Sequence, residues 1–155
     1  MIQRVQSIYL ALTVVLAFIL LNGHILQFRD STGPDIFMDF KGIWKMTETG
    51  DLSMIQNVAP AAIVIALISL VSLVAILLFR NRKLQKKVTI ALIFLSLVLS
   101  VLFIVYLFSI RSKYDEGIIF APRMSVPPVM LILGILAYRG IKKDDELVKS
   151  YDRLR

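Results

Sequence analysis

The sequence predicts an all-α membrane protein, a bundle of four transmembrane helices with both termini in the cytoplasm and a small outer cap. Of its 155 residues, 57% are apolar and 19% are charged, whereas soluble domains average about 45–50% and about 25%. The charges are also unevenly placed, because they leave four long uncharged stretches. This pattern is typical of a chain surrounded by lipid rather than water.

The first two uncharged stretches are long enough to cross a bilayer. Residues 5–28 form a run of 24 without Asp, Glu, Lys or Arg, and a spanning helix needs about 20. We predict the first span at 6–22. No small-x-small cleavage pattern follows it, which favours a retained helix over a signal peptide. A second run of 28 uncharged residues predicts a span at 58–79.

The third and fourth stretches complete the bundle. A run of 23 uncharged residues predicts a span at 88–110. The fourth run has only 15, but Pro127 and Pro128 suit a first helical turn and Arg139 can extend its charge to the headgroups. We therefore predict a fourth span at 126–141 and treat the chain as one domain.

The basic residues predict the orientation. The connection 80–87 and the tail 142–155, together with Arg4 and Arg139, hold 12 of the 18 Lys and Arg residues, and the loops 23–57 and 111–125 hold six. Basic residues concentrate on the cytoplasmic side, so both termini are expected inside. We expect no binding of nucleic acid, since a short connection beside lipid headgroups usually serves topology.

Small residues at helical spacing predict where the helices pack. In hydrocarbon, helices associate through close packing of small side chains. The candidates are Ala62, Ala66 and Ser69 in the second span and Ser96 and Ser100 in the third, with Ser7, Ala11, Gly134 and Ala137 as matching positions. The alternative is contact with a second copy or a partner.

The loop 23–57 is the largest segment outside the predicted spans. Turn signals surround Phe37, Phe40 and Trp44, which predicts short strands or an aromatic hairpin. Residues 118–120 of the second outer loop can add a strand to it, giving a small sheet over the bundle. The alternative is a solvated loop whose aromatic side chains lie at the membrane interface.

The composition argues against most enzyme classes. The chain has no Cys and one His, which leaves few ligands for zinc. It contains no P-loop, dinucleotide or nucleophile-elbow motif, and no ionisable residue lies at a predicted midplane, where transporters and channels need them. We predict no catalytic activity, cofactor or metal.

Both ends of the chain carry recognisable sequence. Residues 1–10, MIQRVQSIYL, and 142–155, KKDDELVKSYDRLR, resemble a family of uncharacterised small four-span inner-membrane proteins of Bacteroidetes-type bacteria. The resemblance implies a location in the bacterial inner membrane and carries no established activity. In the tail, Leu147, Tyr151 and Leu154 are spaced as one helical stripe, suited to docking a partner or to a solvated helix beside the membrane.

We therefore predict a non-catalytic accessory or scaffolding subunit of an inner-membrane complex, with the lipid bilayer and other membrane or cytoplasmic proteins as its partners. The predicted partner contacts are Gln3, Arg4, Leu147, Tyr151, Asp152, Arg153 and Arg155. The alternative function is binding of a lipid or small ligand in an outer-leaflet pocket near Arg123. The residues predicted for that pocket are Trp44, Gln56, Asn57 and Arg123.

Overall fold

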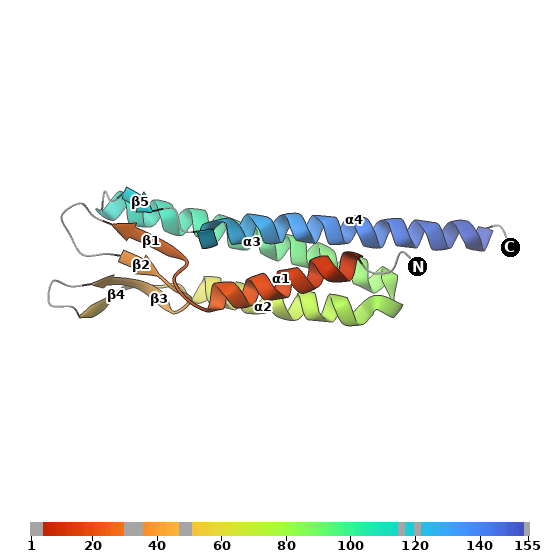
Figure 1. Cartoon of the computed structure of the whole chain (residues 1–155), viewed down its shortest axis with the longest axis horizontal. Helices are drawn as coiled ribbons and strands as arrows, with labels where there is room; N and C mark the ends of the chain where they lie inside the picture. Colours follow the sequence, from red (N-terminus) through yellow and green to blue (C-terminus); the bar gives the residue numbers. More distant parts are fainter. Residues whose placement is uncertain (1–4, 30–35, 47–50, 115–116, 120–121, 154–155) are drawn as a thin grey trace.

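Four α-helices lie side by side and a β-sheet covers one end of them (Figure 1). The computed structural model describes residues 5–29, 36–46, 51–114, 117–119 and 122–153. Side-chain positions are described for 5–25, 36–46, 51–112 and 122–146. We call the end with the strands the sheet end and the opposite end, where both termini lie, the tail end.

The helices form a ring in which each packs against two neighbours. They are α1 (Val5–Leu21), α2 (Ala59–Leu77), α3 (Arg82–Tyr114) and α4 (Val126–Arg153). Helix α1 packs on α2 and α4, and α3 packs on the same two helices. Short 3₁₀ turns precede α3 and α4, at η1 (Leu78–Arg80) and η2 (Pro122–Ser125).

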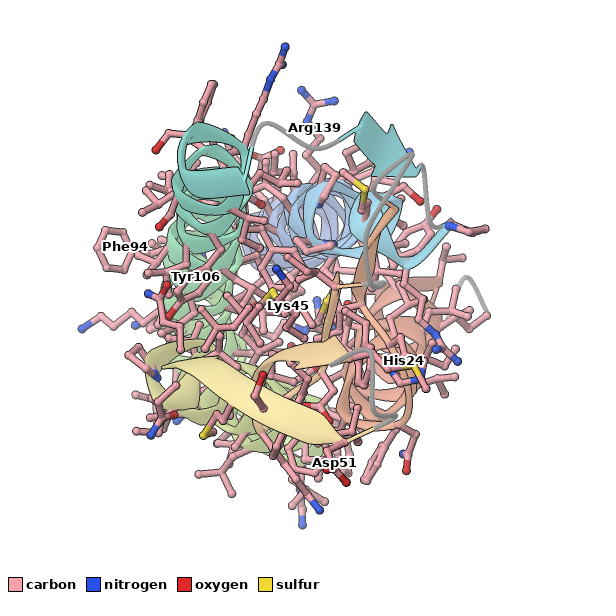
Figure 2. The ribbon with its side chains drawn as sticks, turned by 90° about the vertical axis from the view of Figure 1, so that its left-hand side faces the viewer. His24, Lys45, Asp51, Phe94, Tyr106 and Arg139 are labelled. Atoms are coloured by element: carbon pink, nitrogen blue, oxygen red, sulfur yellow. The ribbon has the colours of Figure 1, made fainter. Side chains whose placement is uncertain are left out.

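The helices have the length and the surface expected of a membrane protein. Three segments in the described chain, Ala59–Arg80, Arg82–Ser112 and Pro122–Glu146, are long and apolar enough to span a bilayer, and Val5–Leu21 is a shorter apolar helix. Large apolar side chains such as Phe94, 63% exposed, point away from the bundle (Figure 2). An apolar outer surface of this extent suits contact with lipid.

Local sequence explains where the helices begin and end. Gly23 has a φ of +99° just after α1, a conformation that ends helices and that glycine adopts without strain. Pro60 stands in the first turn of α2, where the Asn57 side chain accepts a hydrogen bond from the Ala59 amide at 2.7 Å. Helix α4 begins at Val126, as predicted from the prolines that follow it.

The sheet has five strands in the order β4-β3-β2-β1-β5. Their bounds are Leu26–Arg29, Ile36–Met38, Gly42–Met46, Leu52–Asn57 and Gly117–Ile119, numbered β1 to β5 along the chain. All neighbouring strands are antiparallel. The predicted sheet is therefore present, including the strand from the second loop, since β5 pairs with β1.

The packing face of α2 differs from the prediction. The buried residues of α2 are Ala61, Ile65, Ile68, Ser72 and Ala75. Ala62 and Ser69 are half-buried at the edge of this face, and Ala66 is exposed. Ala66 therefore does not pack inside the bundle, because α2 has small residues on two faces and the neighbouring face turns inward; for Ala66, contact with a second copy or a partner stays a prediction.

The other predicted packing positions fall on both sides of the helices. Ser96 is buried and Ser100 half-buried in α3, and Gly134 and Ala137 of α4 are buried. In α1, Ser7 is half-buried and Ala11 exposed. The inward face of α1 is instead formed by Leu10, Thr13, Ala17 and Leu20.

The helices at the tail end extend beyond the predicted spans. Helix α3 begins at Arg82, so most of the predicted connection 80–87 is helical. Helix α4 continues without a break from the predicted fourth span to Arg153. The tail end is thus built from helical backbone rather than loops.

Candidate functional site

Charged residues of α3 and α4 form a clamp at the tail end. The Lys86 ammonium lies 2.6 Å from Asp145 Oδ2, and the two side chains are only 24% and 12% exposed. Arg82 donates a hydrogen bond of 2.5 Å to the backbone carbonyl of Asp144. Cations in the first turns of α3 face the positive end of its own helix dipole. The acid and the carbonyl from α4 offset that repulsion and join the two helices.

Polar side chains also lock the turn between α2 and α3. The Asn81 side chain accepts a hydrogen bond from the Leu84 amide at 3.2 Å, which caps the start of α3. Gln85 is fully buried, and its amide donates to the Ala75 carbonyl at 2.9 Å. The tail end therefore holds α2, α3 and α4 in fixed positions.

An open groove of about 360 Å³ lies beside the clamp, between α1 and α4. Glycine makes the close approach of these helices possible, because a Cβ atom on Gly140 would lie 3.3 Å from Gln6 Cβ. The described lining residues are Val5, Gln6, Tyr9, Leu136, Arg139, Gly140, Lys143 and Asp144. The groove thus combines an apolar wall with two cations and one acid.

The sequence pattern alone does not predict the tail-end clamp. It assigns the basic residues at 80–87 to topology, and it leaves the tail as a helix that either docks a partner or is solvated. A usable signal was present: Lys86 lies just before the third apolar stretch and Asp145 just after the fourth. When two neighbouring helices are antiparallel, the start of one and the end of the other lie at the same depth.

The residues predicted for a lipid pocket lie on several elements of the sheet end, and their grouping in one pocket stays a prediction. Trp44, Gln56 and Asn57 lie on β3 and β4, at one edge of the sheet. Arg123 precedes α4 and donates a hydrogen bond of 3.0 Å to the carbonyl of His24, just before strand β1. Its guanidinium packs against Gly23, where any side chain would collide with it.

The hairpin between β2 and β3 is organised by one carboxylate. Asp39 Oδ1 accepts hydrogen bonds from the amides of Lys41 and Gly42, both at 2.8 Å, and from the Trp44 indole at 3.1 Å. Three donors on one oxygen fix both the turn and the tryptophan. This bonding explains why Trp44 is half-buried rather than free at the surface.

Asp39→Ala is expected to loosen this hairpin by about 1–2 kcal/mol, because it removes the shared acceptor of three donors. The chain has a single Trp, so a red shift of its fluorescence reports the change directly. Asp39→Asn keeps an oxygen acceptor and should leave the emission close to that of the unaltered protein. An equal red shift in both variants would show that the charge, not the acceptor geometry, holds Trp44.

None of the predicted partner contacts has a described side chain. Leu147, Tyr151, Asp152 and Arg153 belong to the helical backbone of α4. Gln3, Arg4 and Arg155 lie outside the described residues. Their role as contacts stays a prediction.

Comparison with known proteins identifies the family of this chain. A family model described as a domain of unknown function (DUF4293) matches residues 2–154. No curated protein and no solved structure matches the chain. The match covers all four helices, the sheet and the tail-end clamp, and the chain therefore belongs to the uncharacterised DUF4293 family.

Proposed function

We propose that this protein is a non-catalytic accessory or scaffolding subunit of a complex in the bacterial cytoplasmic membrane. In this proposal the chain crosses the membrane four times with the tail end in the cytoplasm. The excess of Lys and Arg in the segments at the tail end supports that orientation. Helix α1, with 17 residues, is about 26 Å long, which is enough to cross a slightly thinned bilayer.

The observation that carries the proposal is the projecting end of α4. The clamp holds α4 to α3 at Asp145, and the helix continues to Arg153, eight residues further. That extension adds about 12 Å of helix, and α4 reaches past the other three helices (Figure 1). A helix that is fixed at its base and extended beyond the bundle presents a preformed surface to a partner, which lowers the entropic cost of binding.

The hydroxyl groups within the helices support a structural role. Thr13, Thr89 and Ser96 each donate to the carbonyl four residues earlier, at 2.8–2.9 Å. Ser72 of α2 donates instead to the Leu10 carbonyl of α1 at 2.8 Å. These hydroxyls satisfy the backbone and connect helices, a use that leaves their protons engaged rather than available for a relay.

The test compares the full chain with a chain ending at Glu146, which keeps the clamp and removes only the projecting turns. Each is purified from its host membrane in mild detergent after crosslinking, and partners are identified by mass spectrometry. We expect a membrane complex with the full chain and its loss with the shortened one. Recovery of the same partners with both chains, or of none with either, would contradict the proposal.

Two double variants test whether the predicted stripe on the end of α4 makes the contact with the partner. Leu147→Ala with Tyr151→Ala removes two members of the stripe predicted from helical spacing. Glu146→Ala with Lys149→Ala changes positions that lie about 100° and about 160° around the helix axis from Leu147, outside the stripe. We expect complex formation to fail with the first pair and to persist with the second.

A further inference from the structure

The groove between α1 and α4 lies on the outside of the bundle, open to a surrounding bilayer. Val5, on its α1 side, is 51% exposed. Arg139 and Lys143 are exposed on the α4 side, and Figure 2 shows the Arg139 side chain directed away from the bundle. A membrane lipid can therefore reach the groove without any movement of the helices.

The lining changes from apolar to charged along α4 in the order that a lipid requires. Leu136 comes first, followed by Arg139 and then Lys143. Measured from Val126, the start of α4, Arg139 lies about 20 Å and Lys143 about 26 Å along the helix axis. The hydrocarbon core is about 30 Å thick. Both cations, which have long side chains, thus reach headgroup depth at the tail end.

The charges of the groove match a headgroup that carries both signs. Within the described part of the chain, neither Arg139 nor Lys143 forms an ion pair. Two cations four residues apart on one helix face can share a phosphate. Asp144 is the acid among the described lining residues, and a carboxylate beside a phosphate site favours a ligand that also carries an ammonium group.

We propose that this groove binds one phospholipid with a phosphate and a primary ammonium in its headgroup, as in phosphatidylethanolamine. Arg139 and Lys143 hold the phosphate, Asp144 faces the ammonium, and an acyl chain lies along Tyr9 and Leu136. The depth argument rests on the membrane placement proposed above. The binding itself does not depend on any protein partner.

Native mass spectrometry of the full-length protein in detergent tests the proposal. The protein is titrated with dioleoyl phosphatidylethanolamine and, separately, with dioleoyl phosphatidylglycerol, which lacks the ammonium. We expect the first lipid to bind more tightly. Arg139→Gln with Lys143→Gln should weaken its binding at least about tenfold, because both cations that hold the phosphate are removed.

Two further variants separate the groove from general surface charge. Lys83→Gln with Lys87→Gln removes the same charge from exposed positions of α3 outside the groove lining, and it should leave binding unchanged. Asp144→Asn should reduce the ratio of the affinity for phosphatidylethanolamine to that for phosphatidylglycerol. Equal weakening by both double variants, or no preference between the lipids, would overturn the proposal.

Competition with soluble glycerophosphoethanolamine tests whether the groove binds a membrane lipid or a free phosphate ester. If it displaces the lipid at equal concentration, the groove binds a free phosphate ester and the lipid proposal fails. We expect no displacement, because the soluble molecule lacks the acyl chains. The accessory role is judged separately by partner recovery, so either proposal can fail alone.

Discussion

Lys86→Met is expected to lower the free energy of unfolding by about 2–3 kcal/mol, because it leaves the Asp145 carboxylate without its lysine at a buried position. The two side chains are 24% and 12% exposed and their charged atoms lie 2.6 Å apart. Solvent therefore screens the pair only weakly. Reversible unfolding in mixed detergent micelles, followed by circular dichroism, measures the change.

The double variant Lys86→Met with Asp145→Leu is the control. Replacing both members of a buried ion pair by apolar residues is often neutral or stabilising, so we expect it to regain most of the lost stability. Lys83→Met, at an exposed position one residue after Arg82, should change stability by less than about 0.5 kcal/mol. A loss for Lys83→Met equal to that for Lys86→Met would mean that the clamp contributes nothing specific.

The helices and the sheet were predictable because their signals are local. Uncharged stretches predicted the four helices, and the prolines at 127 and 128 predicted the start of α4 at Val126. The apolar residues at 118–120 predict a strand beside the first loop, and the strand β5 at Gly117–Ile119 pairs with β1. In each case, composition over a short window determines the backbone state.

Side-chain pairing between helices was less predictable, since it depends on helix rotation. Successive residues differ by about 100° around a helix axis, and α2 has small residues on adjacent faces. The face of α2 that carries Ala61 and Ser72 points into the bundle, and Ser72 donates a hydrogen bond to the Leu10 carbonyl of α1. Nothing in the sequence of α2 alone indicates that bond, because its acceptor is a backbone atom of α1.

For the candidate site too, local sequence signals predict the position of residues but not the contacts between their side chains. Charge counting predicts that the basic segments share one end of the bundle, but the clamp and the groove require contacts between α1, α3 and α4, which are distant in sequence. Lys86 and Asp145 are 59 residues apart. The predicted grouping of Trp44, Gln56 and Asn57 with Arg123 stays a prediction, because it also depends on contacts between segments that are distant in sequence.

Helices α3 and α4 approach each other closely at Gly134. It is buried, and a Cβ atom there would lie 3.1 Å from Ile93 Cγ1 and 3.9 Å from Ile93 Cα. Close contact between backbones is a main source of helix association in lipid, because it maximises dispersion attraction. The contact therefore contributes to the packing that holds α4 in register with α3.

Gly134→Leu is expected to cost about 3 kcal/mol of unfolding free energy, because its side chain must displace Ile93 and separate the two helices. Ile93→Ala alone should also destabilise, through lost packing. Combined, the two changes should cost clearly less than the sum of their separate effects, since the smaller residue makes room for the larger one. Strict additivity in the same unfolding assay would show that Gly134 and Ile93 are not in contact, and it would remove the close approach as the reason for glycine in this part of α4.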